Sequence, residues 1–306
     1  MQLKKILVIK FGGLGDVILS LSAMYSIFKK FNRKITLLTE EPFNSLLKKS
    51  DWFNEIQTIK RSMFYTYDIF QIKRKLKYEG FSEIFDLQTS RRSSYYLKLF
   101  KKSGGQTNGI GKYSTISHSN IKRDFMHTIE RQKDQLSLSN IKFIKNPDLR
   151  WLYNQKSKFK EKKIALIVPG GSKSRLNKRI PLKIFFEITS LFLKNNITPF
   201  LIGGMDDINV CNKIKEKFPK SQNLCLKTSF FDIGLLAKKA LFSVGNDTGP
   251  MHIISRANNK TLILFTKNSN PDLCCPVGEN VESLSFFGDE SSFEETVLKK
   301  TKLAIS

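Results

Sequence analysis

Apolar runs alternate with amphipathic segments along most of the chain. Short runs rich in β-branched residues and leucine are bounded by polar or glycine-containing stretches, and between them apolar residues recur at helical spacing. This alternation predicts parallel α/β units. The predicted strands are 6–10, 34–39, 55–60 and 83–88 in the first half, and 164–169, 198–204, 223–227, 241–246 and 261–266 in the second.

The pattern is interrupted between the two halves. Residues 154–163, NQKSKFKEKK, are polar and charged and show no apolar periodicity, which is typical of an interdomain linker. We therefore expect two α/β domains, residues 1–155 and 163–306. Near the end, Ser292 and Glu295 have capping-box spacing and predict a closing helix. The pattern leaves open whether that helix packs back on the first domain.

Length and composition agree with a globular protein of two domains. The chain has 306 residues, of which 40% are hydrophobic. No run reaches the roughly 18 to 20 apolar residues that a membrane span needs, and the apolar part of the first 13 residues is too short for a signal peptide. We expect a cytosolic protein. No CxxC pair occurs among the four cysteines, so free thiols are expected at Cys211, Cys225, Cys274 and Cys275.

The formal net charge of +25 has three interpretations. The lysines are scattered along the chain, which compositional drift alone would produce. A nucleic-acid partner would also favour basic residues, but no zinc finger, basic region with heptads or aromatic RNA-binding signature occurs. An anionic membrane surface or a polyanionic substrate needs only a diffuse basic surface. Charge alone does not choose among them.

The N-terminal strand runs into a glycine loop and then a helical pattern, ILVIKFGGLGDVILSLSAM. A dinucleotide site would have G-x-G-x-x-G here, but Gly13 and Gly15 are followed by Ile18 where the third glycine belongs. Glu40, after the second strand, stands where a ribose-binding acid would. A nicotinamide-dependent oxidoreductase is therefore one hypothesis, on a partial match. No phosphate-binding P-loop motif occurs in the chain.

Asp16 follows the glycine loop and has two interpretations. Gly12, Gly13 and Gly15 allow close approach of backbone and ligand, so a carboxylate beside them could act on a substrate. Alternatively, Asp16 is an N-cap or first-turn acid favoured by the helix dipole.

A second strand-to-helix junction lies at residues 243–257, SVGNDTGPMHIISRA. Pro250 suits a first helical position, and the exposed amides of a first helical turn attract anions. Asp247, Thr248 and Gly249 therefore stand where a diphosphate could be held. An Asx-type cap of an ordinary helix also explains the polar residues, but it leaves His252 without a role.

Four segments together resemble glycosyltransferase family nine, the ADP-heptose:lipopolysaccharide heptosyltransferase group. They are ILVIKFGGLGDVILSL at the N-terminus, PGGSKSRLNKRIP at 169–181, LIGGMDD at 201–207 and VGNDTGPMH at 244–252. The resemblance covers most of the chain in the family's order. It implies a GT-B fold, two Rossmann-like domains that face each other across a cleft, and inverting transfer of a sugar, heptose above all, from a nucleotide-sugar.

The resemblance also implies roles for particular residues. Asp16 matches the family's proposed catalytic base, which reaches into the cleft from the acceptor side beside Gly12 and Gly13. Lys178 matches a lysine that binds the donor phosphate, where its charge would stabilise the leaving diphosphate in place of a metal. The remaining donor-binding candidates are Asp247, Thr248, Gly249 and His252, with Asp207 near an acid that contacts the nucleoside.

The candidate acceptor-binding residues come from the segment DLQTSRRSSYY at 86–96. It resembles the family's segment near the acceptor, which makes Arg91 and Arg92 candidates for binding carboxylates or phosphates. The sequence departs from the family at Gly12 and Gly13, where serines are frequent, and at Ile180, where a tryptophan is usual. These departures bear on the identity of the donor.

The resemblance implies an ADP-linked nucleotide-sugar donor and no cofactor or metal beyond it. The absence of a D-x-D motif agrees with this. The implied acceptor is a lipopolysaccharide-core-type or other lipid-linked anionic glycan at the inner face of the cytoplasmic membrane, where basic residues would hold the enzyme peripherally. No nucleic-acid partner is expected. A non-catalytic GT-B-like binding protein remains an alternative beside the oxidoreductase.

Overall fold

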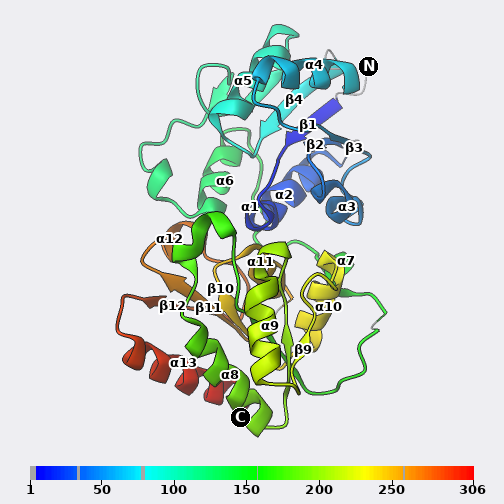
Figure 1. Cartoon of the computed structure of the whole chain (residues 1–306). Helices are drawn as coiled ribbons and strands as arrows, with labels where there is room; N and C mark the ends of the chain where they lie inside the picture. The colour runs from blue at the N-terminus through cyan, green and yellow to red at the C-terminus, as the bar shows by residue number, and fades with distance from the viewer. Residues whose placement is uncertain (1–4, 33–34, 77–79, 157, 258) are drawn as a thin grey trace. The chain divides into compact units, whose positions relative to one another are not determined.

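The computed structural model describes residues 5–32, 35–76, 80–156, 158–257 and 259–306. The chain forms two compact units, Met1–Asp148 and Leu149–Ser306, and each contains a six-stranded parallel sheet with helices packed against it (Figure 1). The predicted α/β class is confirmed. Within the described ranges, no helix is both long enough and apolar enough to cross a bilayer.

The first unit has the strand order β3-β2-β1-β4-β5-β6, the order of a doubly wound nucleotide-binding sheet. Its strands are β1 Lys5–Ile9, β2 Ile35–Thr39, β3 Glu55–Thr58, β4 Phe81–Asp86, β5 Gln106–Gly109 and β6 Ile116–Ser117. Its helices are α1 Leu14–Leu19, α2 Leu21–Phe31, α3 Phe43–Lys48, α4 Tyr65–Lys75, α5 Arg91–Lys102 and α6 Thr128–Ser137, with a 3-10 turn, η2, at Arg123–Phe125.

The second unit repeats this topology, with the order β12-β11-β10-β7-β8-β9. Its strands are β7 Ile164–Val168, β8 Thr198–Leu201, β9 Gln222–Asn223, β10 Phe242–Asn246, β11 Thr261–Thr266 and β12 Val281–Phe286. Its helices are α7 Arg150–Tyr153, α8 Leu182–Lys194, α9 Ile208–Lys217, α10 Phe230–Lys239, α11 Gly249–Ser255, α12 Pro271–Cys274 and α13 Glu290–Ile305, with 3-10 turns η3 Lys173–Lys178 and η4 Met205–Asp207.

Eight of the nine predicted strands are confirmed to within a few residues; Lys34, at the edge of one of them, lies outside the described residues. The strand predicted at 223–227 is wrong. Only its first residue belongs to β9, and Leu226 has a φ of 62°, in the left-handed region that no strand residue adopts. Strands β5, β6 and β12 have polar or short sequences, QTNG, IS and VESLSF, which carry little apolar signal.

The domain boundary lies earlier in the chain than the polar stretch 154–163, of which residue 157 is outside the described residues. Helix α7 packs against α10 and so belongs to the second unit. Its Leu152 is fully buried. The expectation of a first domain that extends to residue 155 is therefore wrong by one short helix.

The closing helix is confirmed, its N-cap differs from the expectation, and its packing, which the sequence left open, is within the second unit. Asp289, and not Ser292, is the N-cap, since its carboxylate accepts a hydrogen bond of 3.1 Å from the Ser292 amide. Helix α13 packs on α8, β10 and β12 of its own unit, where Phe293 and Val297 join the apolar core. It belongs to the second unit and not to the first.

The contact between α7 and α10 depends on Gly234. A Cβ atom at this position would lie 2.5 Å from the carbonyl oxygen of Leu152. We expect Gly234→Ala to lower the free energy of unfolding of the second unit by about 1 to 3 kcal/mol, because the clash outweighs the gain in helix propensity. Denaturant titration measures this. Gly204→Ala is the control, since a Cβ there meets nothing closer than 4.0 Å; equal stability of both variants would contradict the prediction.

Candidate active site

The loop after β1 presents Asp16 to solvent. Asp16 is the third residue of α1, so it lies in the first helical turn, while the N-cap is Gly13. Its side chain is exposed, and within the described residues no hydrogen bond or ion pair engages its carboxylate. Gly13 keeps the adjacent space open, since a Cβ there would meet only Asp16 Oδ2, at 4.0 Å. An unpaired carboxylate therefore stands beside free space.

Gly12 has a different role from Gly13. A Cβ at Gly12 would lie 2.6 Å from the ring of Phe43 and 3.0 Å from Glu40 Oε1. Its amide donates a hydrogen bond of 2.7 Å to the same Glu40 oxygen. The space beside Gly12 is therefore occupied by protein, and of the two predicted loop glycines only Gly13 opens space for a ligand.

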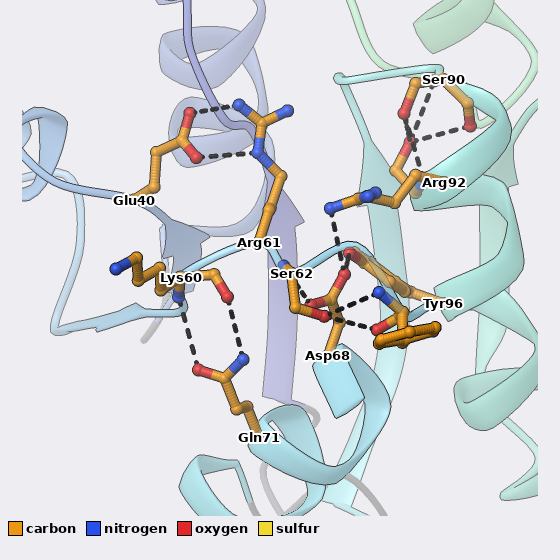
Figure 2. Close-up of polar contacts among 11 residues, drawn as sticks. Glu40, Lys60, Arg61, Ser62, Asp68, Gln71, Ser90, Arg92 and Tyr96 are labelled. Carbon is orange, nitrogen blue, oxygen red and sulfur yellow. Dashed lines mark hydrogen bonds and ion pairs between the residues drawn. The ribbon is translucent and has the colours of Figure 1, made fainter. Parts of the chain in front are cut away.

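The Glu40 carboxylate is fully engaged within its own unit. Besides the Gly12 amide, it accepts two hydrogen bonds from Arg61, at 2.6 and 2.7 Å, in a bidentate pair (Figure 2). Arg61 in turn lies over the ring of Phe11, 5.4 Å from its centroid. Glu40 therefore shapes the glycine loop. Since its carboxylate is already engaged, it is not free to bind a ribose, as the oxidoreductase hypothesis requires.

Two buried charged residues lie behind Asp16, at the carboxyl ends of β1 and β4. Lys10 is almost fully buried, and its ammonium contacts the Leu87 carbonyl at 3.4 Å. Burial lowers the pKa of Lys10, although the charges of Asp16 and Asp86 raise it. Burial raises the pKa of Asp86 to about 6, against the opposing effect of Ser93, of two backbone amides and of Lys10. Lys10 thus interacts electrostatically with both carboxylates.

A basic cavity of about 970 Å³ lies at the carboxyl ends of β2 and β3 in the first unit. The Arg61–Glu40 pair lies in its lining, and the Gln71 side chain forms hydrogen bonds with both the amide and the carbonyl of Lys60 (Figure 2). The lining residues are Glu40, Glu41, Thr58, Ile59, Lys60, Arg61, Ser62, Met63, Gln71, Lys75 and Arg92. Four basic side chains against two acidic ones favour an anionic ligand.

Arg92 reaches this cavity because a buried acid holds it. Asp68 on α4 is fully buried, forms an ion pair with Arg92 at 3.3 Å, and accepts hydrogen bonds from the Tyr96 hydroxyl and the Ser62 amide (Figure 2). The Arg92 guanidinium also lies over the Tyr65 ring, 4.6 Å from its centroid. Of the two predicted acceptor arginines, Arg92 lines the cavity, whereas the neighbouring Arg91 is exposed and does not.

In the second unit, Asn246 fixes the loop that carries Lys178. Its buried side-chain amide donates to the carbonyls of Pro169 and Gly170, at 2.8 and 2.9 Å, and accepts from the Ile180 amide at 3.2 Å. The Ile180 side chain, where the family usually has tryptophan, is buried in the apolar core. One asparagine at the end of β10 therefore holds both ends of the loop.

Lys178 and Asp247 meet at the carboxyl end of the second sheet. The Lys178 ammonium lies 3.4 Å from Asp247 Oδ2 and 2.9 Å from the Ser269 hydroxyl, which itself donates to Asp247 at 2.6 Å. His252 Nε2 is 3.9 Å from Asp247 Oδ1. A cavity of about 420 Å³ opens beside Lys178, lined by Ser174, Arg175, Asn177, Lys178, Asn268, Ser269, Asn270, Leu273 and Cys274.

Helix α11 begins at this junction as predicted, but one residue before Pro250. Thr248 is the N-cap and Gly249 the first helical residue, and Pro250 follows within the first turn. The Thr248 hydroxyl is buried and has no hydrogen-bond partner among the described residues. A buried hydroxyl without a partner is costly in the free protein, so a bound ligand that supplies one is favoured.

Asp207 has a structural place. Its carboxylate accepts hydrogen bonds from the amides of Gly171 and Gly204, at 2.7 and 2.9 Å, and lies 3.5 Å from Arg179. A Cβ at Gly170 would overlap it, at 1.9 Å. Asp207 therefore joins the loops after β7 and β8, and its contact with a nucleoside stays a prediction.

Sequence reasoning missed Lys10, Arg61, Asp68, Asp86 and Asn246. Three of them share a signal that was available, namely a polar residue at the carboxyl end of an apolar strand, where ligands of parallel sheets bind. Arg61 and Asp68 carry no such signal, since each acquires its place only through a partner distant in the chain. The four free cysteines, by contrast, are as expected.

A family model described as glycosyltransferase family 9 (heptosyltransferase) matches residues 69–302. The chain belongs to this family. It is therefore a glycosyltransferase, and neither the oxidoreductase nor the non-catalytic binding protein stands. The lipopolysaccharide heptosyltransferase 1 of Campylobacter coli is 20% identical over 296 residues, which cover 85% of this chain and 83% of that protein.

Solved structures of the family share the fold over nearly the whole chain. A family 9 glycosyltransferase from Veillonella parvula has a TM-score of 0.78 at 17% identity and covers 100% of this chain and 98% of its own. The E. coli heptosyltransferase WaaC with ADP has a TM-score of 0.78 at 16% identity, with coverage of 98% and 99%. E. coli heptosyltransferase II has a TM-score of 0.75 at 19% identity, with 98% of each chain covered. The predicted GT-B fold is confirmed.

The raised pKa of Asp86 predicts a pH dependence of stability. Between about pH 4 and pH 6 the folded protein keeps the Asp86 proton that the unfolded chain, with a pKa near 3.8, has released. The contribution of this group to stability therefore falls as pH rises through this window, by up to about 3 kcal/mol.

Asp86→Asn has no proton to lose and retains an acceptor for the amides of Gln88 and Thr89, which Asp86 Oδ1 now accepts at 3.0 Å. We expect the stability of the variant relative to the wild type to rise from pH 4 to pH 6. Denaturant titrations across this range measure the difference, and parallel curves for the two proteins would show that Asp86 does not titrate there.

Proposed function

We propose that this glycosyltransferase transfers heptose, with inversion and without a metal ion, from ADP-heptose to an anionic lipopolysaccharide-core-type acceptor. The observation that carries the proposal is the exposed, unpaired carboxylate of Asp16 beside the space left by Gly13, in a chain of family 9. The name of the Campylobacter relative supports the sugar and the acceptor class.

The first unit supplies the base. The Asp16 carboxylate takes the proton of the acceptor hydroxyl as its oxygen attacks the anomeric carbon of the donor. The bond from that carbon to the diphosphate oxygen breaks, and the nucleoside diphosphate leaves with the electron pair. Displacement from the opposite face inverts the anomeric centre.

The second unit holds the donor. A phosphate that competes with Asp247 for the Lys178 ammonium gains a charge-assisted contact, and the Thr248 hydroxyl and the Gly249 amide at the start of α11 supply further donors. The lysine charge stabilises the departing diphosphate, which is the task that a divalent ion has in other glycosyltransferases. Solved relatives that contain ADP and an ADP-heptose analogue support this choice of donor.

The basic cavity of the first unit receives the acceptor's anionic groups. Arg61 and Arg92 are held in place by Glu40 and Asp68, and the exposed Lys60 ammonium has no partner among the described residues. Fixed guanidinium groups recognise carboxylate or phosphate by paired hydrogen bonds. Such an acceptor is lipid-linked, so we propose that the enzyme works at the inner face of the cytoplasmic membrane, to which its +25 charge attracts it.

Asp16→Asn separates the catalytic role from a role in helix stability. An amide cannot accept the proton of the acceptor hydroxyl, and general-base catalysis contributes about 10²- to 10⁴-fold. We expect transfer to slow by at least about a hundredfold, while the free energy of unfolding changes by no more than about 1 kcal/mol. Initial rates with ADP-heptose and a lipopolysaccharide-core acceptor, together with denaturant titration, measure both.

Glu130→Gln is the matched control for this experiment. Glu130 is an exposed first-turn acid of α6 in the same unit, so its replacement removes the same kind of helix-dipole interaction. The control should transfer at the wild-type rate. If Asp16→Asn does so as well, Asp16 is a helix-terminal acid only.

Lys178→Met tests the donor site and the absence of a metal together. Loss of the ammonium should weaken ADP binding about tenfold or more, because charge-assisted hydrogen bonds contribute about 1.5 to 3 kcal/mol. Calorimetry in excess chelator measures the affinity for ADP. The wild type should bind ADP equally well with and without the chelator. Lys173→Met is the control, since this lysine shares the loop but does not line the cavity. Wild-type affinity in Lys178→Met, or chelator-sensitive binding, would overturn the respective part of the proposal.

A further inference from the structure

The first unit carries an unusual concentration of exposed apolar side chains. Met63, Phe64, Tyr67 and Phe70 are 84%, 69%, 55% and 56% exposed, respectively. They are four of the thirteen large hydrophobic side chains that are exposed in the described parts of the chain, and all fall within eight residues. The other nine are more widely spaced. Contiguous exposed apolar groups of this kind mark an interaction surface.

Two of these residues share one face of α4, and the other two lie directly before the helix. Met63 and Phe64 precede α4, and Tyr67 and Phe70 follow at positions that share a side of the helix, where their rings stack 6.3 Å apart. The opposite side of α4 is fixed in the unit by Asp68 and Ile72, both fully buried. The exposed face is therefore presented by a helix that is already folded and packed. We call Met63, Phe64, Tyr67 and Phe70 the α4 apolar face.

Basic residues border the α4 apolar face. Lys73 and Arg74 are exposed at the C-terminal end of the helix, and Lys60 and Arg61 precede the face in sequence. The single acid between residues 60 and 75 is Asp68, which is buried against Arg92. Aromatic side chains with a basic border match a bilayer surface that offers acyl chains below anionic headgroups.

The α4 apolar face also adjoins the basic cavity, since Met63 belongs to both. We propose that this face docks on the anionic surface of a phospholipid bilayer, with the aromatic side chains in the headgroup region. This inference rests on the proposed function in one respect, that the acceptor is lipid-linked. A docked α4 brings the mouth of the cavity to the level of the headgroups, where the anionic part of such an acceptor lies.

The test is sedimentation with vesicles, which needs no substrate. The wild type should bind vesicles of phosphatidylcholine and phosphatidylglycerol at least about tenfold more tightly than vesicles of phosphatidylcholine alone. The variant Phe64→Ser/Tyr67→Ser/Phe70→Ser should lose at least about tenfold in affinity for the mixed vesicles. Phe287→Ser is the control, because this ring is 81% exposed but belongs to the second unit. Circular dichroism checks that each variant is folded.

Activity provides a second readout. The triple variant should transfer sugar at the wild-type rate to an acceptor without acyl chains, and at least about tenfold more slowly to the same acceptor embedded in mixed vesicles. Binding of the triple variant to mixed vesicles at wild-type affinity would overturn the proposal. A second result would also overturn it: light scattering that shows a dimer for the wild type and a monomer for the triple variant, while both proteins bind vesicles with equal affinity. A second copy of the chain would then cover the face. Failure of sugar transfer with every acceptor would refute the proposed function and leave the vesicle result standing.

Discussion

Parallel pairing of the strands is the constraint on which the candidate site depends. In a parallel sheet all strands end at the same edge, so residues that follow different strands become neighbours whatever their separation in sequence. Lys10 follows β1, Glu40 follows β2, Arg61 comes shortly after β3, and Asp86 ends β4. The second sheet repeats the arrangement with the loop after β7 and the junctions after β10 and β11. Polar and charged side chains are therefore brought together at the carboxyl ends of the strands in each sheet.

Acidic residues at these edges act mainly on the protein itself. Glu40 holds the Gly12 amide and Arg61, Asp68 holds Arg92, and Asp207 joins two loops. Each satisfies buried amides or a guanidinium that would otherwise be costly to desolvate. Asp16 differs from all three, because its carboxylate is exposed and unpaired in the described structure. The candidate base is thus distinguished from the structural acids because its carboxylate binds no group of the protein in the described structure.

The sequence predicts the fold better than it predicts the role of each residue in the site. Strands such as ILVIK and TLILFT are apolar and β-branched, so periodicity locates them, whereas QTNG forms β5 only because β4 lies beside it. The loops carrying Asp16, Lys178 and Thr248 follow from local motifs. Which glycine opens space and which acid is already engaged depend on partners far along the chain, as with Gly12 and Phe43 or Gly170 and Asp207. Local sequence patterns contain no record of such partners.

The ion pair between Lys178 and Asp247 sets a threshold for ligands of the second unit. In the free protein the lysine already has a counter-ion, and the Ser269 hydroxyl bridges the pair. An incoming anion must compete with a carboxylate that is covalently tethered and thus present at high effective concentration. A singly charged anion exchanges one such contact for another and gains little. A diphosphate brings several oxygens and more charge, so the same ion pair that preforms the site also selects against small inorganic anions.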